Sequence, residues 1–232
     1  MNRKKIVMLL VTLCLIAIVG VGATLAYFTS ETETLSNVVT MGEIKIGLQE
    51  NQVKVDTEDS DGDNDTKEYV QDGSVDPITK GGLNFADILP GMTVPKNPTV
   101  TVDAKSEDCF VRAEVSVEKT VGVNGANTLS DDDIKDIVTD IETQMETNGW
   151  TKNTDGYYYY KVQLSAGAKQ VLFESVSIPL EWKNNAADQK FTIKIKAEAV
   201  QADYLEDTVL QKNAAGDVIG WTGIVMETET ND

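Results

Sequence analysis

An acidic stretch between residues 57 and 68 has the spacing of a calcium-binding loop. With Gly62 at position six of an EF-hand loop, acidic side chains fall at positions three, five, seven, nine and twelve. Position one is Thr57, where an acid is preferred, and the flanking residues do not read as helices. Weak extracellular Ca²⁺ binding is therefore one hypothesis, and a solvated acidic loop is the alternative. The ligands under the first hypothesis are Asp59, Asp61, Asp63, Asp65 and Glu68.

Histidine is absent from the 232 residues. This excludes His-Glu-x-x-His zinc hydrolysis, Ser-His-Asp triads and Cys-His nucleophile pairs. No glycine-rich phosphate loop is present, and with 38 acidic residues a close carboxylate pair is expected by chance. We therefore expect no catalytic residues and no enzymatic activity, and no cofactor other than the hypothesised Ca²⁺.

The charge balance limits the classes of partner. The chain has 38 acidic residues against 20 basic ones and a net charge of −18. Nucleic acid and anionic membrane surfaces both require basic contacts, so neither is an expected partner. Self-repulsion of this surface would be reduced by salt or divalent cations.

The first 26 residues have the pattern of a signal peptide. Three basic residues, Arg3, Lys4 and Lys5, precede an apolar run, and small residues occupy the positions before Tyr27. We expect cleavage between Ala26 and Tyr27, secretion to the cell surface or matrix, and membrane contact only before cleavage. An uncleaved anchor is the alternative, because residues 6–26 approach the length of a bilayer span. Cleavage leaves one domain, 27–232, in which Cys109 is the single cysteine and is expected to be buried at the start of a strand.

Most of the mature chain alternates apolar and polar residues with the period of a β-strand. The clearest segments are residues 44–48, 109–118 and 190–200, and Asn153–Gly156 is a hairpin turn. Many short strands without a βαβ rhythm predict a mainly β protein, an antiparallel jelly-roll or Ig-like β-sandwich. Within it, 56–80 is expected to form an acidic loop insertion, and 203–232 a weakly structured C-terminal segment.

One amphipathic helix is predicted at about residues 130–147. Ser130 is a good N-cap, and three aspartates in the first turn suit the helix dipole. Apolar residues at helical spacing form one stripe, and Gly149 is the expected stop. The four tyrosines from Tyr157 to Tyr160 place two rings on each face of a strand. Packing against neighbouring elements is the preferred interpretation, and a carbohydrate or partner platform is the alternative.

Several segments resemble the TasA/camelysin family of exported proteins of Gram-positive bacteria. The signal-peptide junction Thr24-Leu25-Ala26-Tyr27-Phe28-Thr29-Ser30 is the most specific of them. Further matches are scattered along the mature chain: Asn37 with 41–46, Leu89-Pro90-Gly91, 172–173 with 176–179, and 191–202.

The resemblance implies a jelly-roll-like sandwich, processing by a SipW-type signal peptidase, and assembly into biofilm-matrix fibres with other copies and other matrix proteins. In such fibres the segment freed by cleavage completes the sheet of the next subunit. The matching segment here is 27–39, where Glu31 and Glu33 are charged. Its apolar anchors are Phe28, Leu35, Val38 and Val39.

Two other functions are kept as alternatives. One is a monomeric Ca²⁺-dependent surface adhesin or binding module, which the acidic loop would serve. The lesser one is a camelysin-like peptidase, which the resemblance implies but for which this chain has no histidine.

Overall fold

A computed structural model describes residues 42–56, 68–120, 129–182, 189–205 and 208–224. Contacts divide the chain into two units, Met1–Met41 and Gly42–Asp232, and all of the described residues belong to the second. The signal peptide, its cleavage site and the whole of segment 27–39 therefore lie outside the described residues.

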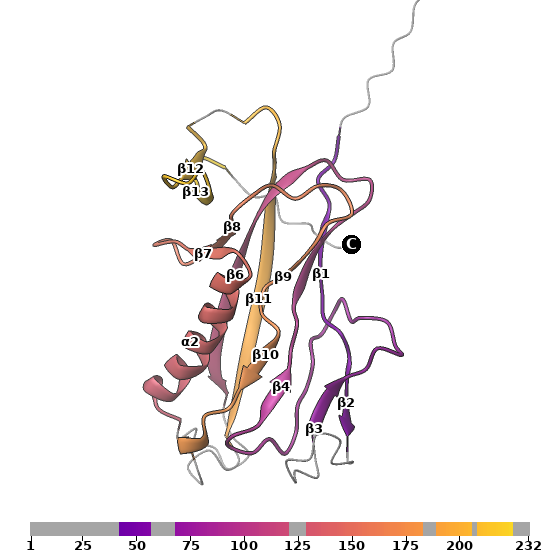
Figure 1. Ribbon diagram of the computed structural model, residues 1–232, viewed down its shortest axis with the longest axis vertical. Coiled ribbons are helices and arrows are strands. Elements are labelled where there is room, and N and C mark those ends of the chain that lie inside the picture. Colours follow the sequence, from indigo (N-terminus) through magenta and orange to yellow (C-terminus); the bar gives the residue numbers. More distant parts are fainter. Residues whose placement is uncertain (1–41, 57–67, 121–128, 183–188, 206–207, 225–232) are drawn as a thin grey trace, which may run out of the picture. The chain divides into compact units, whose positions relative to one another are not determined.

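The described part of the chain is mainly β, as predicted, and every strand pair in it is antiparallel. Its largest sheet has the order β11-β6-β8-β7, and a second sheet has the order β1-β5-β9. Three two-stranded sheets pair β4 with β10, β2 with β3, and β12 with β13 (Figure 1). The strands are β1 Ile46–Gln49, β2 Val53–Asp56, β3 Glu68–Gln71, β4 Thr93–Pro95, β5 Thr99–Val102, β6 Cys109–Thr120, β7 Trp150–Lys152, β8 Tyr158–Tyr160, β9 Lys169–Val171, β10 Ser175–Ser177, β11 Lys190–Gln201, β12 Leu210–Lys212 and β13 Val218–Trp221.

The two long strands, β6 and β11, form a twelve-residue antiparallel ladder that runs from Lys190 opposite Thr120 to Gln201 opposite Cys109. Alternation gives the ladder two different faces. Odd-numbered residues such as Val111 and Ile195 point into the core, and even-numbered residues such as Arg112 and Lys194 lie on the outer face. The prediction for these two segments is confirmed.

Helix α2, Asp131–Thr147, confirms the predicted helix almost to the residue. Ser130 and Asp133 form a reciprocal capping box, which satisfies two backbone N–H groups that the helix cannot pair internally. Thr147 is the last helical residue, and Gly149 reverses the chain at φ +88°, a backbone conformation that L side chains rarely adopt. α2 contacts β6, β7 and β10, so it fills one side of the sandwich between the two layers.

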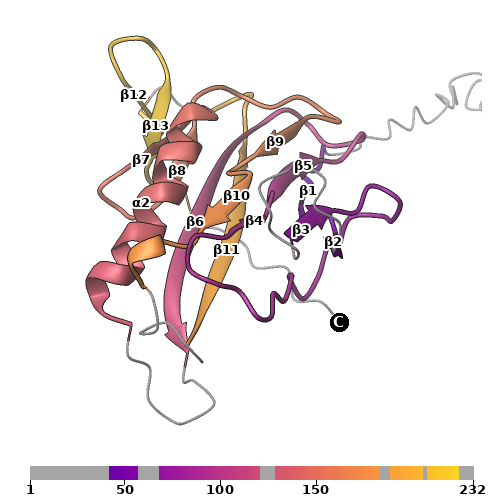
Figure 2. The same cartoon turned by 60° about the horizontal axis from the view of Figure 1, so that its bottom comes forward.

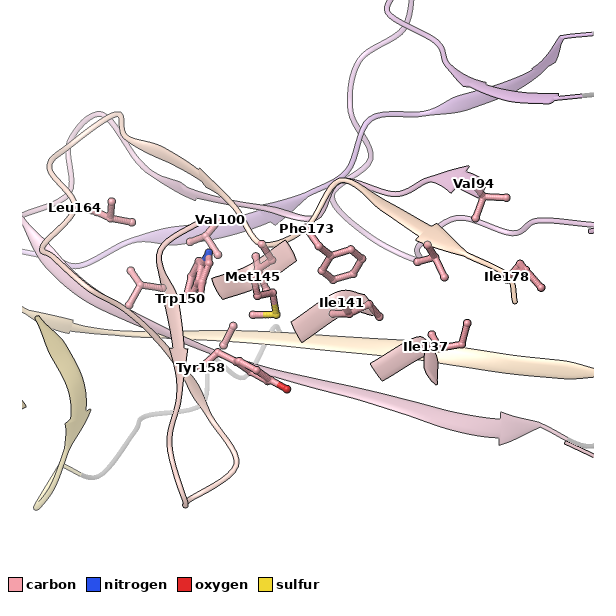
Figure 3. Close-up of a cluster of buried hydrophobic side chains, with 14 of the residues drawn as sticks. Val94, Val100, Ile137, Ile141, Met145, Trp150, Tyr158, Leu164, Phe173 and Ile178 are labelled. Atoms are coloured by element: carbon pink, nitrogen blue, oxygen red, sulfur yellow. The ribbon is translucent and has the colours of Figure 1, made fainter. Parts of the chain in front are cut away.

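One core joins the helix to both layers of strands (Figure 3). Ile137, Ile141 and Met145 of α2 pack against Val100 of β5 and Phe173, with other side chains of both layers. Trp150 and Trp182 are also buried in it. This shared core is consistent with the predicted β-sandwich. Figures 1 and 2 show α2 and β1 on opposite sides of the β6–β11 pair.

Two segments predicted to lack regular structure contain strands. β3 lies inside the expected loop 56–80 and pairs with β2 in register from Asp56 opposite Glu68. β12 and β13 lie inside 203–232 and form a hairpin whose Val218 and Trp221 are buried. These strands have three or four residues, too few for alternation to show in the sequence, and pairing is what makes them recognisable.

Substitution of Ile141 by alanine tests the role of α2. Ile141 is 1% exposed, so its truncation should leave a cavity and lower the free energy of unfolding by about 2–5 kcal/mol. Urea denaturation measures this. Val162→Ala, at a side chain 48% exposed, is the control and should change the value by less than about 0.5 kcal/mol. Equal effects of both substitutions would contradict the packing described.

Candidate functional site at the outer edge of strand β11

Strand β11 is an outer strand of its sheet. In the order β11-β6-β8-β7 it pairs with β6 on one side, and no second strand pairs with it within the described ranges. Strand β1 is likewise an outer strand of its sheet, whose order is β1-β5-β9. An outer strand presents a row of backbone N–H and C=O groups that can template another strand.

A groove of about 420 Å³ lies between these two outer strands. β1 approaches β11 directly, and the groove is lined from both of them and from the loop that precedes β4. Its lining residues are 48–50, 78–82, 192–195 and Lys96.

Apolar side chains beside the groove are only partly covered. Ile193 and Ile195 of β11, and Val115 and Val117 opposite them on β6, point inward but are half-buried. Further along the same ladder Val111 is fully buried. The core is therefore filled on the side of α2 and incompletely covered on the side of the groove.

The groove is basic although the chain is acidic. Lys80, Lys96 and Lys194 line it, with Glu50 as the one acidic residue among its lining residues. Lysines outnumber acidic residues in this lining although the whole chain has a net charge of −18, but Lys96 is paired with Glu50 and Lys194 with Glu118.

Lys96 and Glu50 form a buried ion pair in the groove, with side chains 10% and 8% exposed. Backbone hydrogen bonds hold both residues in position. The Lys96 N–H donates to the Glu174 carbonyl at 3.0 Å, and Glu50 exchanges backbone hydrogen bonds with Ile78. The pair thus connects the end of β1, the loop carrying Ile78 and the segment after β4.

The outer face of the same sheet carries an arginine enclosed by aromatic rings and a carboxylate. The Arg112 Nε donates to Glu198 Oε2 at 2.8 Å, and its Nη1 donates to the Tyr159 hydroxyl at 3.0 Å. Its guanidinium carbon lies 3.8 Å from the centroid of the Tyr157 ring and 4.8 Å from that of Trp221. Trp221 belongs to β13, so this cluster fixes the C-terminal hairpin to the sheet.

Glu198 is held in its charged form. Burial alone would raise its pKa, but hydrogen bonds from Lys196 and Arg112 outweigh burial and leave the pKa below its ordinary value of 4.5. Lys196 lies next to the groove residues on β11 and donates to Glu198 Oε1 at 2.6 Å. The charged network on the outer face therefore reaches from the hairpin to the edge of β11.

Of the five predicted calcium ligands, Glu68 alone lies within the described residues. Glu68 begins β3 opposite Asp56, so the two ends of the acidic loop meet at the end of a hairpin. Asp59, Asp61, Asp63 and Asp65 lie outside the described residues, and the Ca²⁺ hypothesis stays a prediction. Elsewhere in the described chain, no group of three or more Cys, Asp or Glu residues is arranged to hold a metal ion.

Cys109 and two residues of the tyrosine run, Tyr158 and Tyr159, are packed inside the fold. Cys109 is fully buried as the first residue of β6, as predicted, and burial raises the pKa of its thiol to about 11. Tyr158 faces the main core and donates to Glu142 of α2 at 2.8 Å. Tyr159 packs edge-on against Trp221 on the other face, with 5.0 Å between ring centroids. Packing is thus confirmed for Tyr158 and Tyr159.

Sequence reasoning missed Arg112, Lys96 and Glu50 as parts of a site. Arg112 and Glu198 are 86 positions apart and Glu50 and Lys96 are 46 apart. A polar residue on an alternating strand reads as solvent-facing, and only the fold brings these partners together. The clearest available signal was Lys194 and Lys196 on the most regular strand, because lysine often marks an outer strand.

The sequence matches no model of a protein family, no curated protein and no solved structure. The resemblance described above therefore rests on its quoted segments. Among the helices of the described residues, none has both the length and the apolar character that crossing a bilayer requires.

Removal of one partner tests the buried pair in the groove. Glu50→Ala should leave the Lys96 ammonium buried without a counter-charge and lower the free energy of unfolding by about 3–5 kcal/mol. The matched control is Glu118→Ala, which breaks an exposed pair with Lys194 whose side chains are 53% and 60% exposed. That change should be below about 1 kcal/mol. Similar losses in urea denaturation would show that the groove pair is not buried in solution.

Acid titration of stability tests Glu198. A folded-state pKa below the ordinary value contributes stability above pH 4.5, and the contribution is lost as the pH falls through the folded pKa. The stability difference between the wild type and Glu198→Gln should therefore be largest near neutral pH and shrink below pH 4.5. Glu114→Gln, an exposed residue of β6, serves as control. A difference that is constant from neutral to acid pH would contradict this electrostatic role.

Proposed function

We propose that this protein is an exported structural subunit of a cell-surface or biofilm-matrix fibre. In this proposal, segment 27–39 of one copy adds as a strand to the β11 edge of the next. The observation that carries the proposal is the long outer strand β11, beside a groove with partly covered apolar side chains. The TasA/camelysin resemblance supports the same function.

Strand addition would satisfy two requirements of this edge together. Main-chain hydrogen bonds would pair the outer N–H and C=O groups of β11, and alternate side chains would cover the inner face. Ile193 and Ile195 are the side chains on β11 that such a strand would cover. The free energy would come from apolar burial of about 25 cal/mol per Å², together with backbone pairing on the side of β11 where no strand of the described residues pairs.

The charges of segment 27–39 suit this edge. In an extended strand Glu31 and Glu33 share one face, and Phe28 and Val38 share the other. With Phe28 and Val38 turned inward, the two glutamates would lie on the outer face, where Lys194 and Lys196 project from β11. The lysines would repel a second lysine-bearing edge and attract the acidic donor strand.

Export and assembly form a single sequence of events in this proposal. Cleavage after Ala26 by a SipW-type signal peptidase frees Tyr27 and the donor segment behind it. The uncleaved precursor, whose donor segment is tethered to the membrane by the signal peptide, stays monomeric. The mature protein then polymerises outside the cell, with itself and with other matrix proteins, and needs no enzymatic activity.

Deletion of residues 27–39 tests the donor role. The shortened mature protein should keep its thermal unfolding transition but form no fibres in electron microscopy, because it has an acceptor edge and no donor strand. Added in small amounts to the full mature protein, it should bind growing ends and shorten the fibres. Normal fibres from the deletion variant alone would overturn the mechanism. A variant with residues 27–39 in scrambled order controls for segment length.

A further inference from the structure

We propose that residues 78–82, here named the strap, form a movable cover of the groove that closes by pairing with the outer edge of β1. The structure holds the strap in its open position, joined to β1 at Ile78 alone. The movement follows from the hydrogen bonds and backbone angles of described residues. The role of the strap as a control on strand addition to β11 rests on the proposed function.

One antiparallel bridge joins the strap to the end of β1. The Glu50 N–H donates to the Ile78 carbonyl at 2.9 Å, and the Ile78 N–H donates to the Glu50 carbonyl at 2.8 Å. Two hydrogen bonds exchanged between opposite residues are the repeating unit of an antiparallel ladder. The strap therefore already occupies the strand position next to β1, over a length of one residue pair.

The hydrogen bonds of β1 show which of its residues face the strap. The Asp103 N–H donates to the Lys45 carbonyl at 2.9 Å, one step before the first residue pair of β1 and β5. Because this direction alternates along a strand, odd-numbered residues of β1 pair with β5, and even-numbered residues direct their N–H and C=O groups to the other side. Glu50 bonds to Ile78 on that other side, as the alternation requires.

Continuation of the bridge by one step would pair Lys80 with Leu48. Leu48 directs its N–H and C=O groups toward the strap, and no strand of the described sheets pairs with it there. Both residues line the groove. Movement of Lys80 into that position would therefore fill the groove from the side of β1 and narrow the space beside Ile193 and Ile195.

Two features hold the strap open. Gly81 and Gly82 have φ angles of +86° and +73°, whereas a strand requires negative φ. A Cβ added at either glycine would meet no heavy atom within 4 Å, so backbone conformation and not crowding separates the strap from β1. Opposite residues of a ladder share one face, so pairing would also turn the Lys80 side chain inward with that of Leu48 and desolvate its ammonium.

The strap lies between two fixed ends. Before it, the Gln52 side-chain amide donates to the Asp76 carbonyl at 2.9 Å. After it, the Tyr69 hydroxyl donates to the Ala86 carbonyl at 2.7 Å, and the Ala86 N–H donates to the Tyr69 hydroxyl at 3.0 Å. Between these anchors, residues 79–84 make no hydrogen bond to any other described residue. A segment held only at its ends moves at a low cost in free energy.

Hydrogen exchange on the mature monomer, at concentrations below assembly, tests the closure without requiring fibres. Lys80→Val with Gly81→Thr and Gly82→Val replaces the residues that hold the strap open by strand-forming ones, and it should slow exchange of the Leu48 amide by at least about tenfold. Gly216→Val is the matched control, because Gly216 has φ +89° and equally open surroundings in the turn between β12 and β13. It should leave Leu48 exchange unchanged. Unchanged exchange in the triple variant would overturn the proposal.

A disulfide trap provides a second variant that leaves both glycines in place. Leu48→Cys with Lys80→Cys brings two thiols opposite each other when the strap closes, at a Cα separation of about 5.5 Å that suits both a ladder and a disulfide. Mild oxidation should crosslink this pair and leave Cys109, which is fully buried, unmodified. Leu48→Cys with Thr79→Cys is the control, because neighbouring residues of a strand point to opposite faces. Absent crosslinking of the first pair, or equal crosslinking of both pairs, would overturn the closure.

Assembly kinetics separate the strap from the proposed function. In the triple variant, protection of the Leu48 amide should be accompanied by slower fibre formation, since the closed strap occupies space that the donor strand needs. Fibres that form at the wild-type rate despite this protection would overturn the control of assembly and leave the fibre function intact. Closure of the strap in a chain whose wild type never forms fibres would leave the closure standing and overturn the fibre function.

Discussion

The antiparallel ladder between β6 and β11 is the interaction on which the rest of the structure depends. Its inner face forms one wall of the core, and α2 and the short strands pack against that wall. Its outer face carries Arg112 and Glu198, which hold the C-terminal hairpin in place. Because β11 has a strand on one side only within the described residues, the same ladder that organises the core also leaves an edge on which another strand can pair.

The two sides of the sandwich are closed in different ways. α2 covers one side with Ile137, Ile141 and Met145, each almost fully buried. The opposite side, between β1 and β11, has half-buried apolar side chains and a buried Lys96–Glu50 pair. A buried pair of this kind adds little stability by itself, because desolvation of both charges offsets their attraction. Its position between three segments fixes the shape of the groove instead.

Edges of this kind must be controlled, because an open strand pairs with whatever strand it meets. Exposed lysines on an outer strand act against pairing between identical edges, and β11 carries two of them, Lys194 and Lys196.

The sequence by itself determined the local elements. Long alternation predicted β6 and β11, and capping and apolar spacing predicted α2 almost to the residue. The residue types predicted burial of Cys109 and packing of the tyrosine run. These features depend on residues within a few positions of one another. The tertiary structure alone decided that β11 is an outer strand, that Glu50 meets Lys96, and that Arg112 lies against Trp221. Periodicity shows which face of a strand is apolar, but it carries no information about which strand lies beside it. The candidate site is made of pairings between distant segments, and only the packing of the whole core selects them.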